Sequence, residues 1–169
     1  MKFIATLFVL ISITTTTLAQ DNDSIETSIT TALDAWHQAA SNADFDAYFG
    51  LMTDTAIFVG TDATEIWDVE AFKNYSKPHF DKGRAWSFKA IDRNVYVEEL
   101  NPSIAWFDEH LETQMGICRG SGVLKKVNGN WKVHHYVLSI AVPNENVSEL
   151  TQSKKEWDSL YIKKMRKKD

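Results

Sequence analysis

The sequence contains one cysteine, no excess of basic residues and, after residue 19, no apolar run long enough to span a bilayer. Cys118 alone cannot form an internal disulfide. A membrane-spanning helix needs about 20 apolar residues, so we expect no membrane insertion of the chain after residue 19. The 18 Lys and Arg residues are outnumbered by 23 Asp and Glu residues, which gives a net charge of −5. This acidic balance argues against nucleic acid or an anionic membrane as the main partner.

The sequence also lacks the short motifs of several enzyme classes. It has no G-x-S-x-G nucleophile motif and no glycine-rich phosphate loop after a strand. Its five histidines are scattered, without H-x-H or H-E-x-x-H spacing, which makes a metal site poorly supported. We therefore predict neither a cofactor nor a metal ion.

Residues 1–19 have the pattern of a signal peptide. Lys2 is followed by an apolar stretch over residues 3–13 and by Thr17-Leu18-Ala19, which resembles a cleavage site. We therefore expect export to the periplasm or the exterior. Loss of Lys2 leaves 17 basic against 23 acidic residues, a net charge of −6. The remaining length predicts one domain over residues 20–142 and a helical extension over residues 143–169.

The stretch from Ala105 to Ser139 predicts two successive hairpins, because turn signals interrupt strand-like sequence at two places. Asn128-Gly129 suits a type I′ turn, since both residues tolerate a positive φ. A second turn is expected near Met115-Gly116. With two-residue loops, one sheet face carries Phe107, Glu109 and His135, and Gly122 lies between the last two.

Glu109 and His135 are therefore the first candidates for function. A carboxylate and an imidazole on an apolar face can act as general acid and base, or as polar anchors for a ligand. The alternative is a polar pair in a half-wet cavity without chemistry. The adjacent His134 points to the opposite face, together with Trp106, Asp108 and Tyr136. Such exposed aromatics suggest a dimer surface or a site covered by the C-terminal helix.

The rest of the chain predicts an α+β fold. Helices are expected over residues 24–40, 45–52 and 68–80, with His37 at the edge of the apolar stripe of the first. Strands are expected over residues 55–60 and 86–97, and a change of alternation near Ile91-Asp92 predicts a bulge. A curved antiparallel sheet packed on three helices would form a cone with one open end. An apolar stripe over residues 147–165 predicts a C-terminal helix that docks on another surface.

These elements and several local motifs resemble the SnoaL-like branch of the nuclear transport factor 2-like (NTF2-like) superfamily, over roughly residues 24–142. The matching motifs are Gly60-Thr61-Asp62 followed by Glu65 and Trp67, Ala105-Trp106-Phe107, and Gly129-x-Trp131-Lys132-Val133 leading to His135. The resemblance implies a pocket inside the cone, with an acidic residue or a histidine on an inward strand face. Many relatives carry a second histidine where this chain has Val137. The superfamily contains both enzymes and binding proteins, so the resemblance does not select a reaction.

Five further residues are candidate ligand contacts. Asp62, Glu65 and Trp67 are expected at the rim of the cone, where Asp62 could instead cap a turn. Phe107 is expected on the inner face. Arg119 is predicted on the outer face opposite Glu112, unless a bulge at the neighbouring glycines turns it inward.

Three functions fit these observations. The first is an exported protein that binds a small molecule, with Glu109 and His135 as polar anchors. The second is a cofactor-independent isomerase, cyclase or dehydratase in which the same pair moves a proton. The third is a homodimeric interaction protein with a vestigial pocket and an outer sheet face that pairs two chains.

Overall fold

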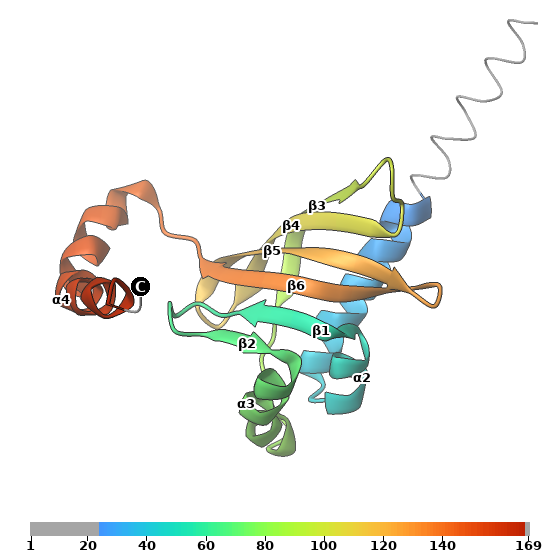
Figure 1. Ribbon diagram of the computed structural model, residues 1–169, viewed down its shortest axis with the longest axis horizontal. Helices are drawn as coiled ribbons and strands as arrows, with labels where there is room; N and C mark the ends of the chain where they lie inside the picture. The colour runs from blue at the N-terminus through green and yellow to red at the C-terminus, as the bar shows by residue number, and fades with distance from the viewer. Residues whose placement is uncertain (1–23, 168–169) are drawn as a thin grey trace, which may run out of the picture.

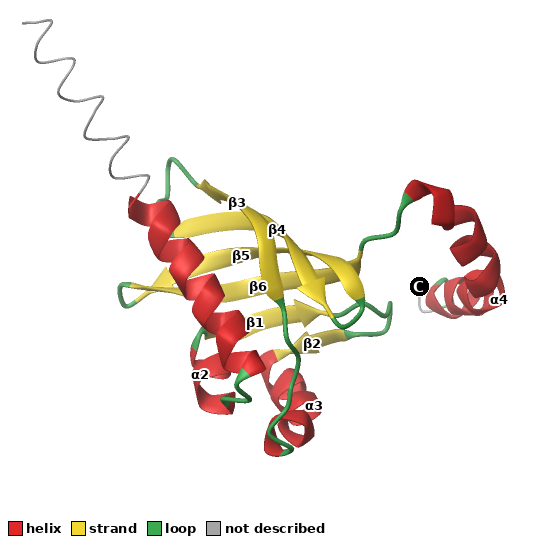
Figure 2. Ribbon diagram, turned by 180° about the vertical axis from the view of Figure 1, so that it is seen from behind, coloured by secondary structure: helices red, strands yellow, loops and turns green. Residues whose placement is uncertain are grey.

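The structure, a computed structural model, describes residues 24–167. The predicted signal peptide lies outside the described residues. The helix over residues 24–41 crosses the inner face of the sheet, as Figure 2 shows, and its apolar stripe is buried. Among residues 24–167, no helix is long and apolar enough to cross a membrane.

Two shorter helices begin at aspartate caps. The Ala47 backbone N–H donates to Asp44 Oδ1 (3.0 Å) at the start of α2 (Phe45–Gly50). At the start of α3 (Val69–Asp81), the Ala71 N–H donates to Asp68 Oδ1 (2.8 Å). Each carboxylate satisfies an N–H that has no partner within the helix.

The sheet has six strands in the order β2-β1-β6-β5-β4-β3, and all neighbours are antiparallel except β1 and β6. The α+β prediction is confirmed, with one parallel pair in the sheet and a short strand, β2, in the segment expected to be a loop. Figure 1 shows the helices of the main body together on one side of this sheet. The strands are β1 (Met52–Val59), β2 (Ile66–Asp68), β3 (Lys89–Val97), β4 (Ile104–Thr113), β5 (Gly116–Val127) and β6 (Asn130–Ile140).

The hairpin between β4 and β5 differs from the predicted register by two residues. Thr113 pairs with Gly116, so Glu109 lies opposite Gly120 rather than Gly122, and Phe107 lies opposite Gly122. Because side chains alternate with a period of two, this shift changes the neighbours but not the faces. Glu109 and Phe107 both point inward, as predicted.

The strand pairing shifts at three places, of which only the one in β3 was predicted. Between β1 and β6, the register shifts between Met52 and Ile57. The pairing of β3 shifts between Ala90 and Asp92, which confirms the predicted bulge. In β6, Val133 pairs with Leu124 but His135 pairs with Val123, which leaves His134 as an extra residue. An odd shift reverses the faces that follow it. Tyr136 therefore points inward and His135 outward, so the prediction for both residues is wrong.

Aromatic side chains fill the deeper part of the cone. The ring of Trp36 lies 5.0 Å from that of Tyr48 and 4.9 Å from that of Tyr136, measured between centroids. Phe58 stacks on Phe72 at 4.1 Å. All five side chains are at most 5 % exposed, so little internal space remains.

The C-terminal helix α4 (Val147–Met165) follows a short 3₁₀ turn, η1 (Asn144–Asn146), and extends away from the sheet (Figure 1). None of its residues is buried. The Tyr161 hydroxyl donates to the Ala63 carbonyl at 2.8 Å, which connects α4 to the loop between β1 and β2. The helix therefore does not cover the outer sheet face, and Trp106 stays 44 % exposed there.

Candidate functional site

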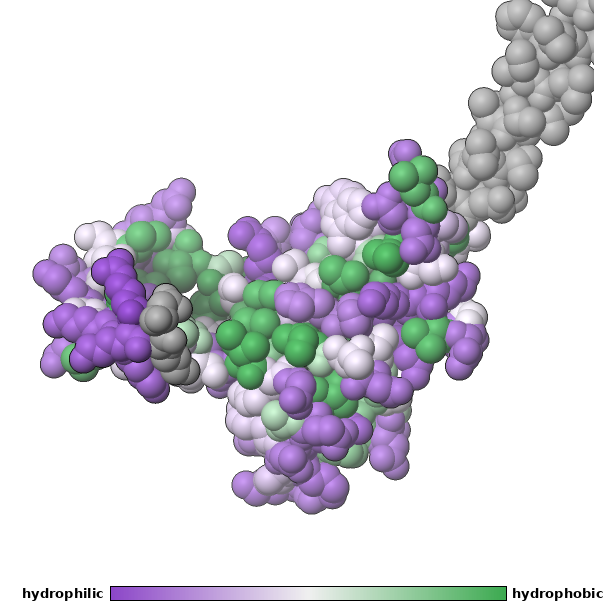
Figure 3. Space-filling model, viewed as in Figure 1, coloured by the Kyte–Doolittle hydropathy of each residue, from purple (hydrophilic) through white to green (hydrophobic). Residues whose placement is uncertain are grey.

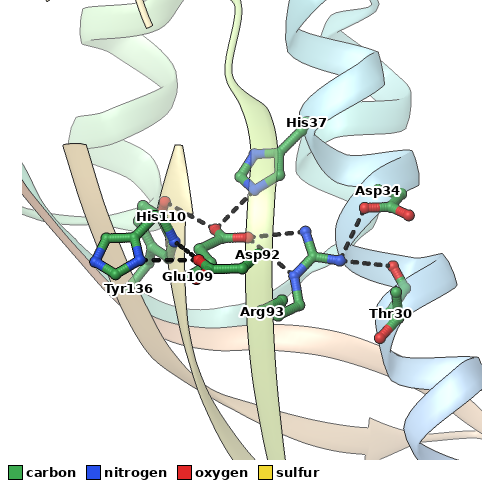
Figure 4. Close-up of polar contacts among 8 residues, drawn as sticks. All are labelled: Thr30, Asp34, His37, Asp92, Arg93, Glu109, His110 and Tyr136. Carbon is green, nitrogen blue, oxygen red and sulfur yellow. Dashed lines mark hydrogen bonds and ion pairs between the residues drawn. The ribbon is translucent and has the colours of Figure 1, made fainter. Parts of the chain in front are cut away.

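Glu109 is the centre of a buried polar cluster on the inner face of β4. Its side chain is fully enclosed, and the whole residue is 1 % exposed. Oε1 lies 2.8 Å from His37 Nε2 and accepts a hydrogen bond from the Tyr136 hydroxyl at 3.2 Å (Figure 4). A buried carboxylate needs such donors to replace lost water.

Arg93, directly opposite Glu109 on β3, supplies the remaining donors. Its Nε and Nη2 atoms donate to Glu109 Oε2 at 2.9 and 2.8 Å. Its Nη1 atom reaches the N-terminal helix, where it donates to the Thr30 carbonyl (3.2 Å) and to Asp34 Oδ1 (2.8 Å). Each Glu109 oxygen thus has two partners, which uses the roughly four acceptor sites of a carboxylate.

This environment keeps Glu109 ionised and Tyr136 protonated. Burial by itself raises the pKa of Glu109, but the hydrogen bonds and positive charges of His37 and Arg93 outweigh burial and lower it. Burial and the negative charge of Glu109 raise the pKa of Tyr136 well above its usual value. A carboxylate that is held as an anion by four donors is a poor proton acceptor.

Gly120 and Gly122 provide room for this cluster rather than for a ligand. A Cβ atom on Gly120 would clash with the Tyr136 hydroxyl and lie 2.9 Å from Glu109 Oε1. A Cβ atom on Gly122 would clash with the His135 carbonyl and lie 2.9 Å from the ring of Phe107. The predicted hole beside Glu109 is thus filled by protein atoms.

The structure does not bring His135 or Arg119 to Glu109. His135 lies on the outer face, paired with Ile57 and Val123. Arg119 also lies on that face, opposite His110 rather than Glu112, with its Nη2 atom 3.3 Å from His110 Nε2. His110 Nδ1 in turn lies 2.9 Å from Asp92 Oδ1. The outer face therefore has its own polar cluster, separate from the buried one.

His37 connects the buried cluster to open space. A pocket of about 340 Å³ lies between the N-terminal helix and the segment before β3. His37, Asp34, Gln38 and Phe88 are among its lining residues. His37 is itself 5 % exposed, so an imidazole that is hydrogen-bonded to Glu109 forms part of a pocket wall.

A second pocket, which we call the mouth pocket, lies where β1 and β6 end and β4 turns into β5. Its volume is about 160 Å³. Glu65 and Trp67, two of the predicted ligand contacts, line it, while Asp62 and Phe107 do not. The other lining residues are Phe58, Gly60, Thr61, Phe72, Tyr75, Trp86, Phe88, Gln114, Met115 and Leu138.

The rim loop of the mouth pocket is held by its own polar contacts. Asp62 Oδ1 accepts hydrogen bonds from the Thr64 backbone N–H (2.8 Å) and hydroxyl (2.6 Å), which lower the pKa of Asp62. The Asp62 N–H donates to Glu65 Oε2 at 3.1 Å. Asp62 thus has the turn-capping role that was the alternative to ligand contact, and the same loop fixes Glu65.

Sequence reasoning missed Arg93, His37 and Tyr136 as members of the buried cluster. Arg93 is in phase with Val95 and Val97, which alternate after the predicted bulge, so the sequence contained a signal for its inward position. The alternation of apolar residues in β6 also changes phase, as it does near Ile91. The residues concerned are Trp131 and Val133 before the change, and Tyr136 and Leu138 after it. His37 gave only the weak signal of a polar residue beside an apolar stripe. Among residues 24–167, no three His, Cys, Asp or Glu side chains gather as a metal site.

Comparisons with known proteins give one family and many similar folds. A family model described as a SnoaL-like domain matches residues 29–143. An NTF2-like protein of unknown function from Pseudomonas putida KT2440 superposes with a TM-score of 0.61 at 14% identity, over 73% of this chain and 92% of the other. No curated protein matches the sequence.

Two further solved structures have the same fold. A Streptomyces avermitilis protein, provisionally named a dehydratase of the NTF2-like family, gives a TM-score of 0.60 at 14% identity over 73% and 99% of the two chains. An NTF2-like protein from Cytophaga hutchinsonii gives a TM-score of 0.57 at 17% identity, over 69% of this chain and 98% of the other. At these identities the likeness concerns the fold alone.

Proposed function

The chain belongs to the SnoaL-like domain family, and within that family we propose that it binds a small molecule in the mouth pocket. The observation that carries this proposal is an open pocket in which half of the lining residues are aromatic and one, Glu65, is acidic. Binding pockets are usually apolar with a few polar groups that orient the ligand.

Glu109 serves in this proposal as a structural anchor. Its four hydrogen-bond partners leave no acceptor site for a ligand, and Tyr136 fills the space above Gly120. The cluster fastens β3, β4 and β6 to the N-terminal helix. The rigid wall that results supports the rings that line the mouth pocket.

The size of the pocket limits the ligand. Its volume of about 160 Å³ is below the roughly 300 Å³ at which drug-sized pockets begin. The ligand is therefore a very small molecule, or a larger one that inserts one end and leaves the rest in solvent.

Native mass spectrometry of the gently purified protein, followed by thermal-shift screening of a small-molecule library, tests this function. A true ligand at 100 times its Kd adds about 2.7 kcal/mol of stability. Trp67→Ala is expected to abolish the shift. Trp106→Ala, which removes a partly exposed tryptophan from the outer face, is expected to retain it. If Trp67→Ala also kept the shift, the assignment of the ligand to this pocket would be overturned.

The second candidate is acid–base catalysis, favoured by the His37–Glu109 contact at 2.8 Å beside the 340 Å³ pocket. Here His37 takes the role expected of His135, and Glu109 orients the imidazole. The test is hydrogen–deuterium exchange next to the carbonyl of a panel of small ketones, followed by NMR. Exchange that is lost in His37→Gln and kept in His110→Gln would support catalysis.

Export and homodimer formation complete the proposal. The composition of residues 1–19 supports export, and N-terminal sequencing of the purified protein should begin at Gln20. Tyr96 and Trp106 stack at 5.8 Å on the outer face and are 43 % and 44 % exposed, which supports a dimer surface there. Figure 3 views this face and shows hydrophobic patches between hydrophilic side chains. Analytical ultracentrifugation of wild type and Trp106→Ala tests the dimer.

A further inference from the structure

We infer that the mouth pocket recognises a small organic cation, a methylated ammonium group on a compact molecule. This inference rests on the proposed binding function and adds the chemical class of the ligand. It follows from three properties of the pocket: its aromatic lining residues, its single negative charge and its small number of hydrogen-bond acceptors.

Aromatic residues make up half of the twelve that line the pocket. Six of the lining residues are aromatic: Phe58, Trp67, Phe72, Tyr75, Trp86 and Phe88. They form a contiguous cluster, with centroids 5.5 Å apart for Trp67 and Phe72 and 5.8 Å apart for Phe72 and Trp86. Aromatic faces carry partial negative charge and attract cations, and tryptophan does so most strongly.

The charge of the lining has one sign. Glu65 is the only acidic residue of the lining, and no Lys, Arg or His is part of it. Within residues 24–167, the ion pairs do not include Glu65. An anionic ligand would be repelled, and a neutral ligand could offer this carboxylate at most a hydrogen bond, without a compensating charge. A cation avoids both costs.

The position of Glu65 is set by the backbone around it. The Asp62 N–H donates to Oε2, and a Cβ atom on Gly60 would clash with the same carboxylate. The missing side chain of Gly60 therefore leaves room for Glu65 over the end of β1. The negative charge is held at the rim of the pocket before any ligand arrives, which lowers the cost of ordering it on binding.

The small number of hydrogen-bond acceptors distinguishes between kinds of cation. Beyond Glu65, the only side-chain oxygens of the lining belong to Thr61, Tyr75 and Gln114, because the N–H groups of Trp67 and Trp86 can only donate. A primary ammonium group is strongly hydrated and requires several acceptors in exchange for its water. A methylated ammonium group needs few acceptors and gains from aromatic contact, so it suits these walls better.

The test compares choline with 3,3-dimethylbutan-1-ol, which has the same shape without the charge, by NMR titration of the full protein. We expect choline to bind at least about tenfold more tightly. Glu65→Gln keeps the hydrogen bond from Asp62 and should reduce this preference to about twofold or less. Glu70→Gln, which changes an acid on α3 outside the pocket, should leave the preference unchanged. Trp67→Ala should abolish binding of both compounds.

The outcomes separate the two proposals. Equal affinity for choline and its neutral analogue, both lost in Trp67→Ala, would overturn the cation inference and leave the binding function intact. Failure of choline to bind, while the library screen finds another ligand sensitive to Trp67→Ala, would do the same. If neither compound nor any library member bound in a Trp67-dependent manner, the proposed function itself would fail.

Discussion

Glu109 and Glu65 both lie beside aromatic clusters, but they differ in burial and in the number of hydrogen-bond donors around them. Glu109 is fully enclosed and receives donors from Arg93, His37 and Tyr136. Glu65 is partly exposed at the rim and accepts a hydrogen bond from the Asp62 N–H. A buried charge must be given partners by the protein, and these partners leave it no capacity for a ligand. A carboxylate at a rim can leave part of its solvation to water or to a ligand.

The strongest way to test this contrast is to remove the cation from the buried cluster. Arg93→Met leaves Glu109 enclosed with half of its donors, so we expect a loss of about 3–5 kcal/mol in the free energy of unfolding. Urea denaturation at pH 7 measures it. Arg119→Met removes the same kind of side chain from the outer face and should cost about 0.5 kcal/mol or less. Similar losses in both variants would show that Glu109 does not depend on Arg93.

The buried glutamate should also make stability depend on pH. The folded-state pKa of Glu109 is lowered, whereas the unfolded value lies near 4.3. The unfolded chain therefore binds the proton first, and stability falls as the pH decreases through the unfolded and then the folded pKa. The contribution of Glu109 is complete above about pH 5 and is lost in acid.

Urea denaturation at pH 6 and at pH 3 measures this effect. Glu109→Gln removes the titrating group, so its stability should change less between the two pH values than that of the wild type. A wild-type pH dependence in Glu109→Gln would contradict the assignment of the acid sensitivity to this residue.

A smaller effect is expected from filling the space above Gly120. Gly120→Ala places a methyl group against the Tyr136 hydroxyl and Glu109 Oε1, and we expect a loss of about 1–3 kcal/mol. Gly50→Ala meets nothing within 4 Å and should be neutral or slightly stabilising, since α2 ends there. Chemical denaturation of both variants gives the comparison. In a Tyr136→Phe background, which lacks the clashing hydroxyl, Gly120→Ala should cost less.

Much of the fold was predictable because the alternation of apolar residues and the turn signals both depend only on residues that are close together in the sequence. The main helices, the long strands and the bulge near Ile91 were found in this way, whereas the short strand β2 was not. The bulge in β6 gave the same kind of signal, because apolar residues change phase between Val133 and Tyr136. The prediction placed a continuous strand through His134 and therefore exchanged the faces of His135 and Tyr136.

The site was less predictable, because its partners come from distant parts of the chain. Alternation placed Glu109 on the inner face correctly, even though the hairpin register was off by two. Alternation cannot say which side chains meet a carboxylate. His37 is 72 residues away in sequence, and its contact depends on how the N-terminal helix crosses the sheet. The space above Gly120, which lies opposite Glu109, is filled by Tyr136, because the extra residue in β6 turns this side chain inward.

The smallest effect on stability should come from Glu65→Gln, and it makes the contrast with Glu109 sharpest. The amide oxygen can still accept the Asp62 N–H, and the site is partly solvated, so we expect a change of about 0.5 kcal/mol or less. Glu109→Gln involves the same pair of residue types but places two N–H donors among the donors of Arg93, His37 and Tyr136. Its cost should be several times larger in parallel urea titrations. If the two variants were equally stable, the buried cluster would not be the anchor described above. If Glu65→Gln were the more damaging, its carboxylate would be part of the folded framework rather than a group held ready for a ligand.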